Sequence, residues 1–269
     1  MSKENLDAST SGLVAWQSDA KGGYVRPDSQ YRNWISKEND ETATFPAEAN
    51  RYHLYISLAC PWACRTAAMR TMKGLEDVIS MSIVHPIWKL TRPNDANDGH
   101  AGWTFVDDSD NAQPFLPPHG DKSSSASDIA SYSVKDNAAM RNTINAAKNV
   151  RELYDLSNPS TPTAKYTIPI LWDKKNSVIV NNESEEIVRI FNSCFNAFAK
   201  NPSLDVYPAH LKEIIDGVNS QVYPNINNGV YRTGFAKTQL AYDDASKNLF
   251  NTMDHFEKVL STQRYVTAT

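Results

Sequence analysis

The order of strand and helix patterns between residues 52 and 195 most constrains what this chain can fold into. Short runs rich in β-branched and aromatic residues predict strands, and apolar residues spaced by three and four predict helices. The patterns predict strands at 52–57, 78–84, 167–172 and 177–180, and helices at 61–73, at 137–156 and from 182 onward.

The order is therefore β-α-β, an insert, and α-β-β-α, which is the order of a thioredoxin-type domain. The insert at about 86–130 is rich in proline and glycine, which predicts a long irregular excursion of the kind that is usually functional. From about residue 205 onward only helical patterns follow. We therefore predict an α/β domain followed by an all-helical domain.

These patterns define three regions of the chain. Residues 1–50 are polar with scattered aromatic residues, which favours an N-terminal arm lying over a folded body. Residues 51–200 would form the thioredoxin-like, ligand-binding domain with its insert, and residues 205–269 a partial helical domain. The 269 residues are enough for two domains.

Composition and charge exclude several classes of protein. The chain is 41% apolar and 22% charged, as is usual for a globular protein, and its net charge of −4 argues against binding to nucleic acid or to an anionic membrane. It shows neither an apolar signal segment nor a run long enough to span a membrane. Three cysteines do not make a disulfide scaffold, and with the six histidines they show no metal-ligand spacing. We therefore predict a cytoplasmic protein without a metal.

Cys60 lies between the predicted strand at 52–57 and the helix predicted to begin at Pro61. Proline suits the first helical position because its missing N–H would have no partner there. The positive end of a helix favours a thiolate over a thiol. Most free cysteines are buried small apolar residues, but this placement favours a reactive thiol.

The other two cysteines are less suggestive. Side chains at i and i+4 on a helix have Cβ atoms about 5–6 Å apart, whereas a disulfide needs about 3.8 Å. Cys60 and Cys64 are therefore not expected to form a dithiol centre, which disfavours a general dithiol oxidoreductase. Cys194 lies in an apolar helical pattern and is expected in the core.

Several motifs in the chain occur together in one order. They are Tyr-Ile-Ser-Leu-Ala-Cys-Pro-Trp-Ala at 55–63, Gly-Trp-Thr-Phe at 102–105, the stretch 167–175 with Val-Asn-Asn-Glu-Ser at 180–184, and the stretch 228–236 with Gln239 and Tyr242. From about residue 10 to its end the chain resembles the glutathionyl-hydroquinone reductases, or xi-class glutathione transferases, which are similar to omega-type transferases. The resemblance implies a thioredoxin-like N-terminal domain and an all-helical glutathione-transferase C-terminal domain.

The resemblance also implies a reaction. Cys60 would attack the sulfur or benzylic carbon of a glutathionyl conjugate and form a mixed disulfide with glutathione. A second glutathione would release oxidised glutathione and regenerate the thiolate. Glutathione is then the co-substrate, and glutathionyl-quinone-type small molecules are the expected partners.

Four residues would hold the γ-glutamyl-cysteinyl part of glutathione. By the resemblance, Ile168 would offer its backbone groups to the cysteinyl part, before an expected cis proline at Pro169, while Glu183 and Ser184 would hold the γ-glutamyl end. A carboxylate and free N–H groups at a helix N-terminus suit the ammonium and carboxylate of that end. The simpler alternatives are helix capping for Glu183 and Ser184 and an edge strand entered by Pro169.

Three further residues are assigned roles by the resemblance. Trp103 would pack over the γ-glutamyl end, Arg151 would bind the glycyl carboxylate, and Tyr207 would direct its hydroxyl at the quinol. The alternatives are a core tryptophan, a solvent-facing arginine and a packing tyrosine.

The chain departs from the family pattern in two places. Cys64 stands where relatives usually have histidine. The chain also ends with the segment 261–269, which in the family is followed by further helices of the C-terminal domain. We therefore expect a truncated member with an open or absent electrophile pocket and without much of the homodimer contact of the family. The alternative function is a catalytically weak remnant that binds glutathione or a protein partner.

Overall fold

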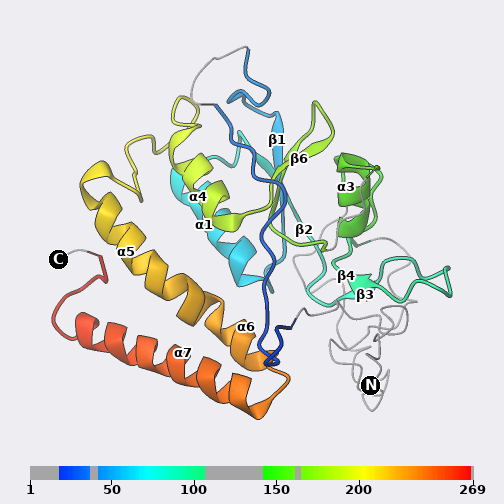
Figure 1. Ribbon diagram of the computed structural model, residues 1–269. Helices are drawn as coiled ribbons and strands as arrows, with labels where there is room; N and C mark the ends of the chain where they lie inside the picture. Colours follow the sequence, from blue (N-terminus) through cyan, green and yellow to red (C-terminus); the bar gives the residue numbers. More distant parts are fainter. Residues whose placement is uncertain (1–17, 37–41, 107–141, 161–164, 268–269) are drawn as a thin grey trace. The chain divides into compact units, whose positions relative to one another are not determined.

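The structure is a computed structural model that describes residues 18–36, 42–106, 142–160 and 165–267 (Figure 1). The described chain divides into two compact units. The first unit consists of Ser29–Asp205. The second consists of the segment that ends at Asp28 together with the chain from Val206 onward.

A four-stranded mixed sheet forms the centre of the first unit. Its order is β2-β1-β5-β6, with β1 parallel to β2 and the other neighbours antiparallel. All five residues of β1 are buried, as expected for a central strand between two layers. The strands are β1 (Tyr52–Ile56), β2 (Ser80–Ile83), β5 (Ile170–Asp173) and β6 (Val178–Asn181).

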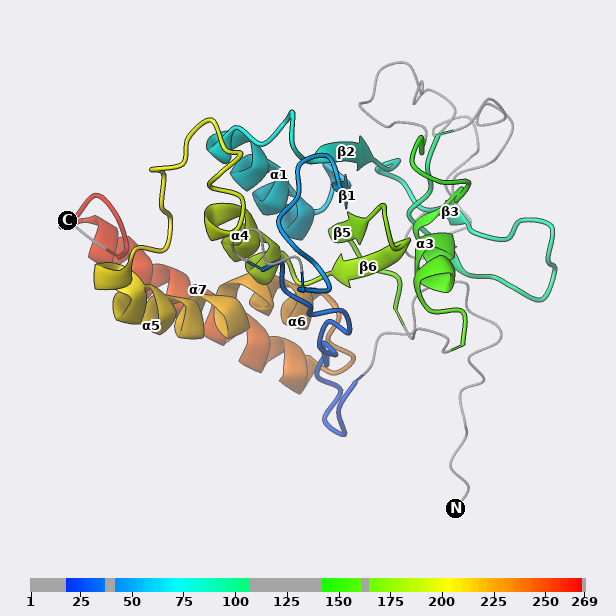
Figure 2. The same ribbon diagram turned by 90° about the horizontal axis from the view of Figure 1, so that it is seen from above.

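Helices cover both faces of this sheet. Helices α1 (Pro61–Lys73) and α4 (Ser184–Ser193) lie side by side on one face, and α3 (Val150–Ser157) lies on the other (Figure 2). The three helices with the four strands confirm the predicted β-α-β and α-β-β-α order.

Helix α1 begins and ends where the sequence predicts. Cys60 is its N-cap residue in an extended conformation, and Pro61 occupies its first turn. Gly74 ends the helix with a left-handed φ of 65°, which costs a glycine little. The N–H of Gly74 bonds the Thr71 carbonyl and the N–H of Leu75 bonds the Arg70 carbonyl, each at 2.9 Å.

The predicted helix at 137–156 is wrong over 142–149, and its residues 137–141 lie outside the described chain. In the structure α3 begins only at Val150. The Oδ1 of Asn142 accepts from the Ile144 N–H, and the Oδ1 of Asn145 accepts from the Ala147 N–H, both at 3.1 Å. Such side-chain bonds to the backbone compete with the helix despite the apolar spacing.

The insert contains regular structure that its composition did not indicate. Strands β3 (Lys89–Leu90) and β4 (Ala101–Gly102) pair antiparallel as a two-stranded sheet. The remaining described residues of the insert are irregular, as predicted, and residues 107–130 lie outside the described chain.

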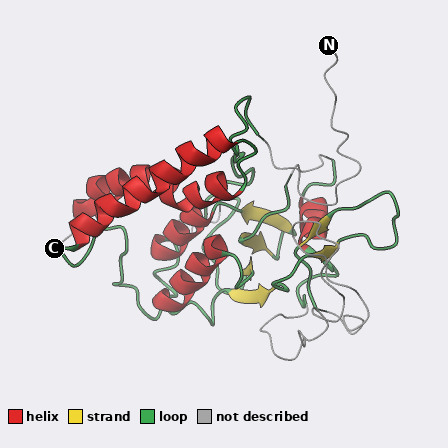
Figure 3. Ribbon diagram, turned by 90° about the horizontal axis from the view of Figure 1, so that it is seen from below, coloured by secondary structure: helices red, strands yellow, loops and turns green. Residues whose placement is uncertain are grey.

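The second unit is helical, and strands occur only in the first unit of the described chain (Figure 3). Its N-terminal segment packs on its own helices, because the Tyr24 and Phe235 rings lie 5.6 Å apart and the Thr238 hydroxyl donates to the Lys21 carbonyl at 2.7 Å. No helix in the described ranges is both long and apolar enough to cross a membrane. The elements are η3 (Ala209–Leu211), α5 (Lys212–Val222), the π-helix η4 (Tyr223–Asn227), α6 (Gly229–Gly234) and α7 (Gln239–Leu260).

Candidate functional site

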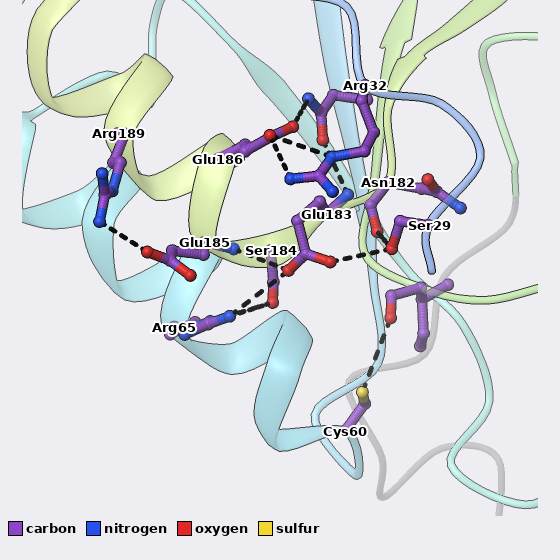
Figure 4. Close-up of polar contacts among 12 residues, drawn as sticks. Ser29, Arg32, Cys60, Arg65, Asn182, Glu183, Ser184, Glu185, Glu186 and Arg189 are labelled. Atoms are coloured by element: carbon purple, nitrogen blue, oxygen red, sulfur yellow. Dashed lines mark hydrogen bonds and ion pairs between the residues drawn. The ribbon is translucent and has the colours of Figure 1, made fainter. Parts of the chain in front are cut away.

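Cys60 lies at the N-terminus of α1 and points at the loop before β5 (Figure 4). Its thiol donates to the Ile168 carbonyl with an S–O distance of 3.8 Å. The Ile168–Pro169 peptide is cis, as expected from the sequence. The fold therefore brings Cys60, the predicted nucleophile, next to Ile168, whose backbone groups were predicted to bind the cysteinyl part of glutathione. Both residues are buried.

The buried Tyr154 of α3 holds the loop that presents Ile168. Its hydroxyl donates to the Thr167 carbonyl at 2.9 Å and accepts from the Asn182 side-chain amide at 2.8 Å. Burial raises the pKa of Tyr154 to about 12, so the phenol stays protonated at neutral pH. Tyr154 lies within the helix predicted at 137–156, but the sequence did not indicate this positioning role, because apolar spacing indicates burial and not hydrogen-bond partners.

Glu183 and Ser184 lie together at the first turn of α4. Glu183 is the N-cap residue, and its carboxylate accepts from the Glu185 N–H at 3.3 Å and from the Ser29 hydroxyl at 2.9 Å. Ser184 is buried at the first helical position. The helix-capping alternative is therefore observed for Glu183, and the same carboxylate places a negative charge beside the N–H groups of the first turn of α4.

Arg65 is a member of this cluster that sequence reasoning missed. It reaches from α1 to α4, and its Nε and Nη2 donate to the Ser184 Oγ at 3.0 and 2.6 Å. Its Nη2 lies 3.7 Å from the Glu183 Oε1, and its guanidinium lies 5.1 Å from the centre of the Trp62 ring. The sequence shows only that a positively charged residue, Arg65, follows Cys60 by five positions. That spacing does not predict that α1 packs against α4, so it could not indicate the contact with Ser184.

Arg151 has a carboxylate partner within the described structure. Its Nη1 lies 2.6 Å from the Asp98 Oδ2, and its guanidinium lies 5.5 Å from the centre of the Tyr166 ring. Its side chain is 15% exposed, so the alternative of a solvent-facing arginine is wrong. Burial raises the pKa of Asp98, but the backbone N–H of His100 and the Arg151 guanidinium outweigh it, so that the pKa lies below its usual value.

Trp103 and Arg151 meet the same backbone segment. The Trp103 carbonyl accepts from the N–H of Val150 at 2.9 Å, directly before Arg151, and the Trp103 ring packs edge-on against Trp88 at 5.5 Å. Trp103 is half-buried. Its ring is thus held against another ring of the insert, and the role predicted for it over the γ-glutamyl end stays a prediction.

Tyr207 belongs to the second unit, where its hydroxyl donates to the Asp216 carboxylate at 2.7 Å. Cys60 and Cys64 do not form a disulfide with each other, as predicted, and the Cys64 thiol donates to the Leu58 carbonyl at 3.4 Å. Cys194 is buried, as its apolar pattern indicated. Among the described residues, no group of three or more His, Cys, Asp or Glu side chains could hold a metal ion.

The assembled groups suit one kind of ligand. A thiol and a peptide carbonyl lie together at Cys60 and Ile168, and a carboxylate, a hydroxyl and a guanidinium lie together at the start of α4. The first pair can meet a sulfur atom beside a peptide group, and the second set can meet an amino acid zwitterion, which carries both charges.

Comparison with known proteins identifies relatives over most of the chain. The chain is 38% identical over 250 residues to the glutathionyl-hydroquinone reductase YqjG of Escherichia coli, covering 91% of this chain and 64% of that protein. It is 37% identical over 264 residues to the glutathione S-transferase omega-like 2 of Saccharomyces cerevisiae, covering 91% of this chain and 68% of that protein. No family model matches the chain.

Solved structures agree with these relatives. The xi glutathione transferase ECM4 of Saccharomyces cerevisiae, solved in complex with glutathione, superposes with a TM-score of 0.71 at 37% identity, covering 88% of this chain and 66% of that one. The predicted fold class, a thioredoxin-like domain with a helical domain, is therefore confirmed. The chain spans slightly less than two thirds of the length of the Escherichia coli relative.

Proposed function

Because the chain belongs to the family of glutathionyl-hydroquinone reductases and xi-class, omega-like glutathione transferases, we propose that it is a glutathione-dependent enzyme that reduces glutathionyl-hydroquinones through Cys60. The observation that carries the proposal is the Cys60 thiol, held at a helix N-terminus against the Ile168 carbonyl before a cis proline. A thiol in that position can receive the sulfur of a bound glutathionyl group beside a backbone edge that bonds its cysteinyl peptide.

The binding part of the proposal assigns each end of glutathione a partner. Glu183 takes the α-ammonium of the γ-glutamyl end, and Ser184 with the N–H groups of α4 takes its α-carboxylate. Arg151 takes the glycyl carboxylate, for which the Asp98 carboxylate, 2.6 Å from its guanidinium, is a chemical precedent within the structure. Trp103 covers the γ-glutamyl end.

The chemical part of the proposal has two steps. The Cys60 thiolate attacks the sulfur of the glutathionyl-hydroquinone, the bond from sulfur to the ring carbon breaks, and that carbon takes a proton, which releases the hydroquinone. The sulfur is oxidised to the disulfide between Cys60 and glutathione, and the ring is reduced. A second glutathione thiolate then attacks the glutathione sulfur of that disulfide, which releases oxidised glutathione and restores the Cys60 thiolate.

The test measures hydroquinone release and the covalent state of the protein. The purified chain receives a glutathionyl-hydroquinone with and without free glutathione. We expect one glutathionyl group on the protein by intact mass when free glutathione is absent, and turnover when it is present. Cys60→Ser removes both, and Cys64→Ser, the neighbouring thiol, keeps both.

Two results would contradict this function. Turnover that survives in Cys60→Ser would exclude Cys60 as the nucleophile. Binding of glutathione without turnover dependent on Cys60 would leave a glutathione-binding protein rather than an enzyme.

A further inference from the structure

Arg65 joins the helix that carries Cys60 to the first turn of the helix that carries Glu183 and Ser184. Two of its N–H groups donate to the Ser184 Oγ at 3.0 and 2.6 Å, and its Nη2 lies 3.7 Å from the Glu183 Oε1 (Figure 4). The central carbon of the guanidinium lies over the Trp62 ring, 5.1 Å from the ring centre. The arginine is thus fixed on one side by a ring and on the other by the start of α4.

This geometry determines the direction in which the Ser184 hydroxyl can donate. A hydroxyl oxygen has two lone pairs and one proton. The two Arg65 N–H groups take the lone pairs, and a guanidinium has no acceptor. The Ser184 proton therefore points away from Arg65, and Ser184 is presented as a donor for an incoming acceptor.

The charges around this hydroxyl favour a carboxylate as that acceptor. The N–H groups at the first turn of α4 and the Arg65 guanidinium both add positive potential beside Ser184. Glu183 supplies the neighbouring negative charge, and its distance of 3.7 Å from Arg65 keeps the two charges adjacent. An α-carboxylate and an α-ammonium on one carbon match this pair of charges.

We propose that Arg65 is a positioning residue for the γ-glutamyl end of glutathione, an inference that rests on the function proposed above. It orients the Ser184 hydroxyl as a donor to the α-carboxylate, and it makes the site prefer a γ-glutamyl ligand over one that lacks this carboxylate. Arg65 thereby couples ligand recognition at α4 to the helix that presents Cys60.

The experiment compares two ligands that cannot react at Cys60. The first is S-methylglutathione, and the second is its analogue in which a 4-aminobutanoyl group replaces the γ-glutamyl group and therefore lacks only the α-carboxylate. Dissociation constants are measured by calorimetry for the wild-type chain, for Arg65→Met and for Arg189→Met. Arg189 is a matched control on α4, where its Nη2 pairs with Glu185 at 2.6 Å.

We expect Arg65→Met to weaken S-methylglutathione binding about tenfold or more, as for the loss of a hydrogen bond to a charged group. The analogue should bind Arg65→Met and the wild-type chain equally, because its interaction with the site does not include the α-carboxylate. Arg189→Met should change neither constant. Arg65→Lys should give an intermediate result, since an ammonium keeps the charge but cannot form the two parallel bonds.

Circular dichroism and thermal unfolding show whether Arg65→Met folds. If it does not, Arg65→Lys carries the test in a cycle with Ser184→Ala, where we expect Arg65→Lys to have no further effect once the hydroxyl is absent. Equal weakening of both ligands, or unchanged S-methylglutathione binding, would overturn the role of Arg65 while the proposed function stands. A wild-type chain that does not bind S-methylglutathione would overturn the proposed function and this inference with it.

Discussion

Arg51 and Asp173 form a buried ion pair at one end of β1 and β5, the two central strands of the first unit's sheet. The Arg51 Nη2 lies 2.6 Å from Asp173 Oδ2 and its Nε lies 3.0 Å from Oδ1, so the pair is bidentate. The same Nη2 donates to the Thr44 carbonyl at 3.0 Å. The hydrogen bonds that Arg51 donates to the Asp173 carboxylate raise the pKa of Arg51 above its usual value, which keeps the guanidinium charged in spite of burial.

Arg51→Met is expected to lower the free energy of unfolding of the first unit by about 3–5 kcal/mol, because it leaves Asp173 as an uncompensated buried charge. Denaturation with urea measures this change. The double variant Arg51→Met with Asp173→Leu removes both charges and should recover more than half of the loss. A double variant as unstable as the single one would show that packing, rather than charge, carries the effect.

His53 is a buried titratable group on β1. Its two ring nitrogens lie 2.7 Å from the Ser80 hydroxyl and 3.0 Å from the Ser82 hydroxyl. Burial, with a smaller contribution from the positive charges of Lys174 and Arg70, lowers the pKa of His53 to about 3. The imidazole is therefore neutral in the folded chain at any pH near neutrality.

This depressed pKa predicts a loss of stability in mild acid. An unfolded histidine binds a proton below about pH 6.5 while the folded one does not, so stability is complete above that pH and falls as the pH drops toward 3. From pH 7 to 5.5 the free energy of unfolding should fall by about 1 kcal/mol through this group. Urea denaturation at both pH values checks this, with His53→Gln as the control in which this part of the difference is absent. An equal fall in both proteins would contradict the assignment to His53.

At the scale of the secondary-structure elements, a glycine at the end of α1 and a glycine inside α5 affect stability in different ways. Gly74 ends α1 with a φ of 65°, and a Cβ atom built there would lie 2.5 Å from the Lys200 Cβ. Gly217 lies inside α5, and a Cβ atom there would meet no atom within 4 Å. Replacing glycine by alanine should therefore lower the stability at Gly74 and raise it at Gly217.

Gly74→Ala is expected to destabilise the first unit by about 1–3 kcal/mol, because alanine is strained at positive φ and its Cβ collides with Lys200. Gly217→Ala should stabilise the second unit by about 0.5–1 kcal/mol, because alanine has the higher helix propensity. Thermal unfolding followed by circular dichroism measures both. A neutral Gly74→Ala would mean that the chain after α1 shifts freely.

At the scale of the whole molecule, the residues proposed to bind glutathione all lie in the first unit. Tyr207, the residue predicted to face the quinol, belongs to the second unit, where Asp216 accepts its hydroxyl. Glutathione binding should therefore depend on the first unit alone. The residues of the proposed glutathione site in the first unit are Cys60, Trp103, Arg151, Ile168, Pro169, Glu183 and Ser184.

Hydrogen exchange on the full chain tests this division. Saturating S-methylglutathione should slow amide exchange in the first turns of α1 and α4 and around Ile168, and leave α5 and α7 unchanged. A ligand at one hundred times its dissociation constant raises the free energy of opening by about 2.7 kcal/mol. The dipeptide Cys-Gly, which lacks the γ-glutamyl group, is the control ligand. Equal protection in α7 would show that the second unit takes part in glutathione binding.

Local rules explain which parts of this structure could be predicted. The ends of α1 follow from Pro61 and Gly74, whose backbone preferences act whatever surrounds them. The predicted start of the helix that contains α3 was wrong because the side chains of Asn142 and Asn145 accept hydrogen bonds from nearby backbone N–H groups. The spacing of apolar residues does not indicate such competing bonds.

The sequence by itself determined the order of strands and helices, the placement of Cys60 at a helix N-terminus and, through its motifs, the family. Only the tertiary structure decided which side chains meet. Cys60 and Ile168 are 108 residues apart, and Arg65 and Ser184 are 119 apart. Helix and strand periodicity specifies which face of an element is buried, whereas a contact between distant residues depends on how two buried faces pack. For that reason the sequence predicted a role for Cys60 and none for Arg65.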